Sequence, residues 1–345
     1  MVALKQRTTV KGRGRMLRLV GVLVVAALLW MCWWVVGHSA YQKSISSWME
    51  QRRTEGWVAD FSDITTRGFP NRFDTTMSGL TLADPGTGVA WSAPFVQFLS
   101  LAYRPYEVIA VLPDNHVIST PLETLQVSHE SARASVYFKP STDLALERAR
   151  LVLNGPRIHS SRGWTVSSTE WRFAIETLPV RENTYRVGME LLELLVPELR
   201  RRALNSSQAL PDQIDVVRAD AVLGIDAPID QRHLEGTYLG INRLELAELS
   251  VRWGEFSFRA SGDLTVSEDG VPHGEIMLRV AQWRTILDLA EKTGLMEPAF
   301  RKALETALDL MSGHEGVLEL PLVFAGGQVS LGPVPLGRAP RFQTW

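Results

Sequence analysis

The stretch that decides the fold is Leu19-Val-Gly-Val-Leu-Val-Val-Ala-Ala-Leu-Leu-Trp30-Met-Cys-Trp-Trp-Val-Val-Gly37, which has no charged residue in 19 positions. An α-helix of this length spans about 28 Å, close to the ~30 Å hydrocarbon core of a bilayer. Three tryptophans gather near its C-terminal end, and indole rings favour the membrane–water interface. The stretch predicts a transmembrane helix over residues 19–37.

The charges on either side of this stretch predict its orientation. Residues 1–18 carry six Lys or Arg residues and no acidic residue, whereas all 38 Asp and Glu residues lie at or after Glu50. Basic flanks stay on the cytoplasmic side of a membrane helix. We therefore expect a basic cytoplasmic tail over residues 1–18 and an exported C-terminal bulk. Without that tail, 30 basic residues face 38 acidic ones, a formal charge of about −8. The near-zero net charge of the whole chain, −2, argues against a nucleic-acid partner.

The sequence favours an uncleaved anchor over a cleaved signal peptide. The apolar stretch is longer than the 7–15 residues of a signal-peptide core. Cleavage after Ala40 would also place the bulky His38 where a small residue is required. Cys32 is the only cysteine, so no intramolecular disulfide can form. The residues before it, Leu29-Trp30-Met31, lack the small side chain expected before a lipidated cysteine.

A second helix is predicted over residues 38–56. Residues 40–55 contain no Pro or Gly, and Tyr41, Ile45, Trp48 and Met49 recur at the spacing of one helical face. Gly56 suits the position after a helix C-terminus. This amphipathic juxtamembrane helix has two alternatives, to dock on the exported domain or to lie against lipid.

Residues 57–345 are predicted to form one exported, β-rich domain. Short runs of alternating apolar and polar residues are separated by turn clusters such as Asp84-Pro-Gly-Thr-Gly88. They indicate an α+β fold with a large, mainly antiparallel, meandering sheet, one apolar face and a few covering helices. Helices are predicted over residues 189–204, from Trp283 and from Pro298. A similar order of predicted strands and helices occurs twice, and this weak repeat leaves open a division into two related halves, residues 57–211 and 212–345.

The sequence holds no recognisable catalytic motif. The seven histidines are scattered, and neither paired metal-ligand spacings nor a nucleophile elbow nor a phosphate-binding loop is present. We therefore expect a protein that is not an enzyme and uses no cofactor or metal. One group of side chains, in which guanidinium and aromatic groups alternate, is the candidate site for an anionic head group; packing at turns and strand edges is the alternative. It consists of Arg67, Phe69, Arg72 and Arg104.

Several stretches resemble a bacterial family known as domain of unknown function 2125. They are Arg67-Gly-Phe-Pro-Asn-Arg-Phe-Asp74, Ser92-Ala-Pro-Phe95, Tyr103-Arg-Pro105, Val108-Ile-Ala110, Trp283-Arg284 and Leu331-Gly-Pro-Val-Pro-Leu-Gly-Arg-Ala-Pro340. The resemblance covers nearly all of the exported part. It implies a bacterial envelope protein and assigns no activity and no functional residue. A more distant likeness, in architecture alone, is to AsmA-type envelope proteins, which combine an N-terminal anchor with a long β-rich groove and are associated with lipid transport.

Three functions remain open at this point. The first is a non-catalytic envelope scaffold or partner-binding module, which uses a sheet edge or the stripe of residues 41–49. The second is a lipid-binding or carrier protein next to the membrane. The third is a hydrolase whose residues are scattered in the sequence. In each case we expect a single-pass protein of the bacterial inner membrane, with a cytoplasmic N-terminus and a periplasmic C-terminal domain. The expected partners are the membrane, an apolar ligand or an envelope protein.

Overall fold

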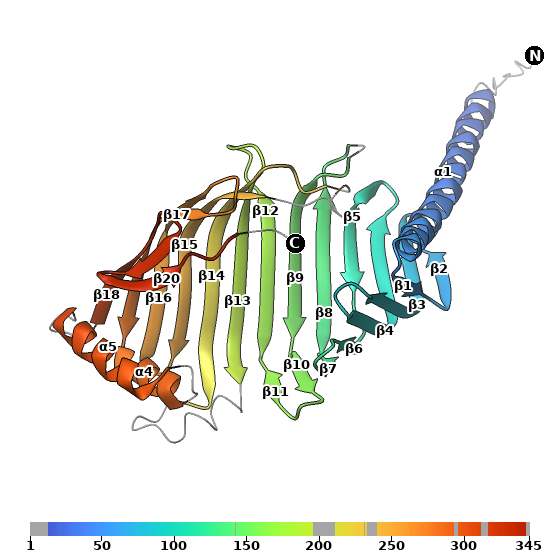
Figure 1. The fold of residues 1–345 in the computed structure, drawn as a ribbon. Helices are drawn as coiled ribbons and strands as arrows, with labels where there is room; N and C mark the ends of the chain where they lie inside the picture. Colours follow the sequence, from blue (N-terminus) through green and yellow to red (C-terminus); the bar gives the residue numbers. More distant parts are fainter. Residues whose placement is uncertain are drawn as a thin grey trace, which may run out of the picture.

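A long N-terminal helix and one very large antiparallel sheet make up most of the molecule (Figure 1). The structure is a computed structural model, and it describes residues 13–141, 143–195, 211–230, 232, 240–292, 296–311 and 317–342. Twenty strands belong to the one sheet, and two short helices lie at its C-terminal end. This architecture confirms the predicted α+β class and the antiparallel meander.

The elements follow one another in a simple order. The helices bounded within the described residues are α1 (Arg13–Thr54), α4 (Trp283–Lys292) and α5 (Pro298–Met311). The strands are β1 (Val58–Asp60), β2 (Asp63–Arg67), β3 (Arg72–Asp84), β4 (Val89–Leu101), β5 (Arg104–Val111), β6 (Asn115–Ser119), β7 (Thr124–Ser128), β8 (Ser131–Phe138), β9 (Leu146–Asn154), β10 (Arg157–Ser160), β11 (Thr165–Ser167), β12 (Glu170–Thr177), β13 (Thr184–Leu195), β14 (Gln213–Ile225), β15 (Ile241–Trp253), β16 (Phe256–Val266), β17 (Pro272–Ala281), β18 (Val317–Ala325), β19 (Gln328–Leu331) and β20 (Val334–Arg338).

At four neighbouring positions of the meander, two shorter strands lie end to end in place of one long strand. β5 and β6 lie end to end along β4, which pairs with β5 near its C-terminal end and with β6 near its N-terminal end. The pairs β8 and β7, β9 and β10, and β12 and β11 continue this arrangement. Two of the interruptions contain the fully buried Pro113 and Pro156. Since proline has no N–H to donate to a ladder, these residues fit the breaks.

The α1 helix is continuous from the membrane-length stretch into the sheet. The predicted segments 19–37 and 38–56 form one helix, because no residue between them breaks it. Its last turns pack on β3 and β4, where the fully buried Met49 contacts a cluster that includes Met77 and Val96. Docking on the domain is therefore confirmed for the stripe of residues 41–49. Further towards the N-terminus, Gly37 permits a close approach of α1 to β3, since a Cβ at this position would lie 2.3 Å from Phe73 Cζ.

The predicted helix over residues 189–204 is wrong in its first part. Residues 189–195 belong to β13, and residues 196–204 lie outside the described residues. β13 pairs along its length with β12 on one side and β14 on the other. Leucine and glutamate favour helices, but pairing in these two ladders overrides that preference. The helices predicted from Trp283 and Pro298 are confirmed as α4 and α5.

Candidate functional site

The β-ladders gather apolar side chains into rows that cross one face of the sheet. Paired residues of neighbouring strands point to the same side. Three adjacent rows carry no charged side chain, and we call their surface the apolar face. They are Val108–Val136–Ala149–Ile175–Val187–Ala221–Leu246–Gly262–Ile276–Leu322, Ala110–Ala134–Leu151–Phe173–Met189–Ala219–Leu249–Ala260–Leu278–Leu320, and Ala132–Leu153–Trp171–Leu191–Val217–Val251–Phe258–Val280–Leu318.

Covered parts of the sheet lie beyond the N-terminal end of the apolar face and over its C-terminal end. Ile45, Trp48 and Met49 of α1 pack on β3 and β4, which precede β5 in the sheet. At the C-terminal end, α4 and α5 pack on β17 and β18 through Trp283 and Leu308. The C-terminal segment adds contacts from two further residues, Ala339 and Phe342, over β15 to β19.

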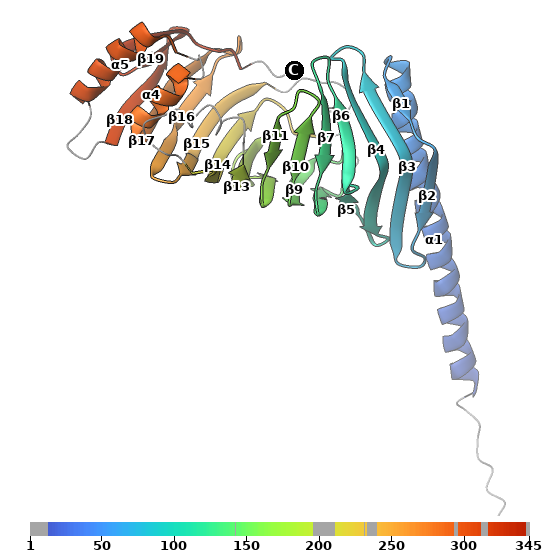
Figure 2. The same ribbon diagram turned by 90° about the horizontal axis from the view of Figure 1, so that it is seen from below.

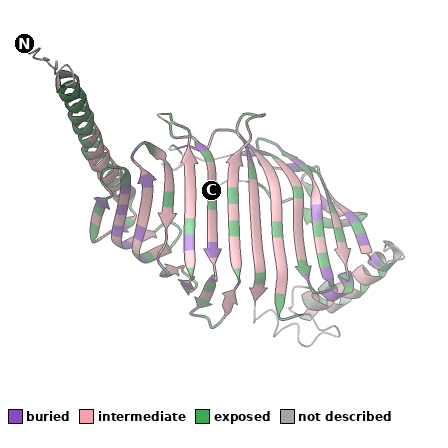
Figure 3. Cartoon of the chain, turned by 180° about the vertical axis from the view of Figure 1, so that it is seen from behind, coloured by how far each residue is buried: buried purple, intermediate pink, exposed green. Residues whose placement is uncertain are grey.

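The middle of the apolar face is open. On β8, β9, β12, β13 and β14, most side chains of the three rows are partly exposed, and only Ala132 and Leu153 are buried. None of the described residues there belongs to a buried hydrophobic cluster. Figure 3 shows the same pattern, with buried positions concentrated towards the ends of the sheet. From strand and residue spacings this open part covers roughly 24 Å by 20 Å, on the order of 500 Å².

The opposite face of the same strands is polar. Arg172 and Arg218 both pair with Glu190, and Arg186 pairs with Asp220. The hydrogen bond from Arg218 lowers the pKa of Glu190, and the one from Arg186 lowers the pKa of Asp220. Charged groups therefore occupy one face of these strands and apolar groups the other, as in antiparallel sheets that have one solvated face.

The predicted ligand-binding residues lie at two adjacent hairpin tips beside α1. Phe69 belongs to the tip between β2 and β3 (residues 68–71), and Arg72 begins β3. Arg104 follows the tip between β4 and β5 (residues 102–103). A hydrogen bond of 2.8 Å from Ala102 N to Asn71 O joins the two tips. Arg67 ends β2 and pairs in register with Asp74. The structure thus brings Phe69, Arg72 and Arg104 together, with Arg67 on the same hairpin.

The residues that hold these tips were missed by sequence reasoning. The indole of Trp30 donates to Pro70 O at 2.8 Å, that of Trp33 to Ala102 O at 3.0 Å, and that of Trp34 to Arg72 O at 2.9 Å. The tryptophan spacing of three and four residues was visible, and it places the indoles on one side of a helix. It suggested membrane anchoring alone, because nothing in the sequence shows which loops reach the helix.

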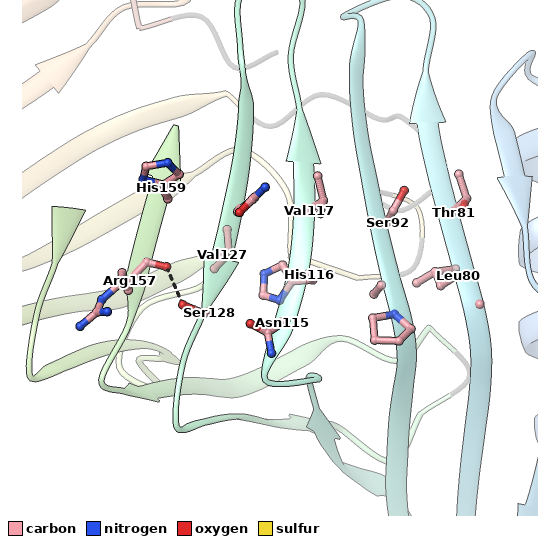
Figure 4. Close-up of a pocket in the computed structure, with 14 residues that line it drawn as sticks. Leu80, Thr81, Ser92, Asn115, His116, Val117, Val127, Ser128, Arg157 and His159 are labelled. Carbon is pink, nitrogen blue, oxygen red and sulfur yellow. Dashed lines mark hydrogen bonds between the residues drawn. The ribbon is translucent and has the colours of Figure 1, made fainter. Parts of the chain in front are cut away.

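A pocket of about 640 Å³ is lined by residues of β3, β4, β6, β7 and β10 (Figure 4). Its lining offers hydroxyl, amide, imidazole and guanidinium groups, and it includes no carboxylate and no thiol. It can therefore supply hydrogen bonds to a bound molecule. The residues whose polar groups line it are Thr81, Ser92, Asn115, His116, Gln126, Ser128, Arg157 and His159.

One histidine of the lining, His116, is buried against a second buried histidine, His129. The rings of His116 and His129 are 5.6 Å apart, and burial lowers the pKa of both imidazoles. A nearby Asp114 opposes the shift at His129. Both rings are therefore neutral near pH 7. Within the part of the chain that the structure describes, no three His, Cys, Asp or Glu side chains are grouped to hold a metal ion.

The comparison with protein families gives a match over most of the chain. Residues 34–340 match the family described as domain of unknown function 2125, uncharacterized protein conserved in bacteria. The matched region begins at Trp34, within the tryptophan cluster, and includes the rest of α1 and the whole sheet. No curated protein and no solved structure matches the chain. The protein belongs to the bacterial family domain of unknown function 2125.

Proposed function

We propose that this protein is a membrane-anchored lipid-binding protein and that it is not an enzyme. In this proposal α1 crosses the bacterial inner membrane once, with the basic tail in the cytoplasm and the sheet in the periplasm. The open part of the apolar face holds acyl chains. Support for the anchor comes from α1, which is long and apolar enough to span a bilayer and exposes the side chains of Leu19, Leu23 and Leu29. The observation that carries the proposal is the partly exposed middle of the three rows.

The chemistry of the apolar face favours an acyl chain over a protein partner. Across the open part, the side chains are aliphatic, aromatic or, at Met189, a thioether, and the indole N–H of Trp171 is buried. Protein interfaces contain substantial polar area and about one hydrogen bond per 100–200 Å². An acyl chain needs none, and each buried methylene contributes about 0.8 kcal/mol.

The direction of the strands connects this face to the membrane. The α1 helix meets the sheet at the two hairpin tips and ends at the opposite edge, where Arg53 pairs with Asp60. It therefore runs along the strands, and the portion of α1 that precedes Trp30 extends beyond the edge that carries the tips (Figures 1 and 2). The loops from β8 to β9 and from β12 to β13 lie at that edge too. An acyl chain that leaves the bilayer can lie along the strands without turning.

The proposal is tested by photo-crosslinking at two neighbouring residues of β12. Phe173 points to the apolar face and Ala174 to the polar face, because successive residues of a strand alternate. Benzoylphenylalanine replaces each residue in turn in the full-length protein, and cells are irradiated. Mass spectrometry of the purified chain then identifies the adduct.

We expect a lipid adduct at position 173 and none at position 174. A protein adduct at position 173 would overturn the lipid proposal in favour of the envelope scaffold. Equal lipid labelling at both positions would also overturn it, because contact would then not depend on the apolar face. Absence of any adduct at position 173, with normal folding of the variant, would show that the face stays empty.

A further inference from the structure

The two hairpin tips lie deeper along α1 than a domain outside the membrane would require. The indole of Trp30 is hydrogen-bonded to Pro70 O, and Trp30 lies seven positions before Gly37, the end of the uncharged stretch. At a rise of 1.5 Å per residue, seven positions correspond to about 10 Å along the helix. If Leu19 and Gly37 mark the two boundaries of the hydrocarbon core, Pro70 lies about 10 Å inside the nearer one.

Keeping the tips outside the membrane would leave too little helix to cross it. Residues 19–29 would then span the core alone, a length of about 16 Å against a core of ~30 Å. Thinning the bilayer to that extent is costly, since mismatch carries a penalty for every ångström. Insertion of the tips needs no thinning.

The tips are built for such a position. Backbone polar groups that enter the membrane must be satisfied by the protein. The indoles of Trp30, Trp33 and Trp34 satisfy carbonyls of Pro70, Ala102 and Arg72. The outward side chains are aromatic, since Phe69 and Tyr103 are both 55% exposed. Exposed apolar side chains at loop tips are unfavourable in water and favourable at the headgroup–acyl boundary.

Basic side chains surround the aromatic ones. Arg72 and Arg104 flank the tips, and about half of each side chain is exposed. Their partners are Asp74 at 3.0 Å and Glu107 at 3.3 Å. Exposed pairs of this kind contribute little, so a lipid phosphate can replace either carboxylate. Long basic side chains reach from an apolar region to the headgroups.

We propose that the tips, residues 68–71 and 102–103, insert into the leaflet nearest the sheet of the bilayer that α1 crosses. Phe69 and Tyr103 then lie among the acyl chains below the headgroups, and Arg72 and Arg104 extend from the tips to contact lipid phosphates. This inference rests on the proposed membrane crossing of α1 but not on a lipid bound to the apolar face.

The test uses fluorescent labels on single cysteines in the full-length protein in nanodiscs. Cys32 is the only native cysteine, so the Cys32→Ser protein is the background. The environment-sensitive label is attached at Phe69→Cys or Tyr103→Cys, and lipids with a doxyl group near the top of the acyl chain act as quenchers. Val89→Cys, 41% exposed at the opposite edge, is the matched control. Val24→Cys reports on α1 itself.

We expect the labels at positions 69 and 103 to lose most of their emission and the label at position 89 to keep it. Quenching at position 24 without quenching at 69 or 103 would overturn the insertion while leaving the membrane crossing intact. Absence of quenching at position 24 would overturn the crossing and the insertion together. Quenching at position 89 equal to that at 69 would overturn the proposed geometry. We also expect the labels at positions 69 and 103 to be quenched more strongly in anionic than in neutral lipid. The double substitution Arg72→Gln and Arg104→Gln should reduce this difference.

Discussion

Two leucines in one row of the sheet provide the sharpest test of the open apolar face. Leu151 and Leu320 belong to the same row of the same face. Leu151 is partly exposed on β9, whereas Leu320 is 3% exposed on β18 within the cluster under α4 and α5. Replacing each by alanine removes the same atoms from a covered and an uncovered site.

The two substitutions should differ in cost. Truncation of a buried leucine loses its transfer free energy and leaves a cavity, about 2–5 kcal/mol in total. We expect Leu320→Ala to destabilise the protein by about 3 kcal/mol. At an open site no closed cavity forms and part of the side chain is already in water, so Leu151→Ala should cost about 1 kcal/mol.

Denaturant unfolding of the lipid-free, detergent-solubilised full-length protein measures both values. Circular dichroism follows the sheet, and tryptophan fluorescence follows the same transition independently. Equal costs near 3 kcal/mol for the two variants would refute the reasoning, because Leu151 would then be as well covered as Leu320.

Three other predictions concern the docked helix and the buried histidines. Met49→Ala should destabilise the domain by about 2–5 kcal/mol, while Met49→Leu should cost far less, as measured by thermal unfolding; equal effects would contradict the packing of α1. Gly37→Val should loosen α1 from β3, because its Cβ would meet Phe73, and hydrogen exchange in β3 should rise; unchanged exchange would disprove the contact. Burial lowers the pKa of His116 and His129 below the ordinary 6.5, so the unfolded chain binds protons first and stability should fall as the pH drops below that value. Replacing both histidines by glutamine should reduce the change of melting temperature with pH, whereas replacing the exposed His159 by glutamine should not. If the double variant kept the pH dependence of the wild type, His116 and His129 would not be its cause.

Much of the fold follows from local patterns in the sequence. The alternation in stretches such as Trp171–Ile175 and the turn at residues 84–88 was sufficient to predict strands and hairpins, because side-chain period and turn chemistry are local properties. The long apolar stretch and the stripe through Met49 likewise predicted the two parts of α1. The leucine-rich stretch from Met189 was misassigned, since pairing with both neighbours decided its structure and that pairing is not local.

The candidate site depended on information that the sequence does not carry. Alternation indicates that a strand has an apolar face, but the register of many ladders decides whether Leu151, Phe173 and Met189 line up. Which part of that face α1 and α4 leave open depends on where they dock. The grouping of Phe69 with Arg104 similarly required the hydrogen bond between their hairpin tips. The arginine and aromatic composition identified the residues, and the fold supplied their common position beside the tryptophans.

The most direct test of an acyl-binding face is the lipid that the purified full-length protein retains. Native mass spectrometry of the wild type is compared with Phe173→Glu, which places a charge on the apolar face, and with Ala174→Glu, which places the same charge on the polar face of the same strand. Lipid that surrounds α1 is common to all three proteins and cancels in the comparison. We predict a retained lipid in the wild type and in Ala174→Glu, and its loss in Phe173→Glu. Equal lipid content in the three proteins would contradict the account.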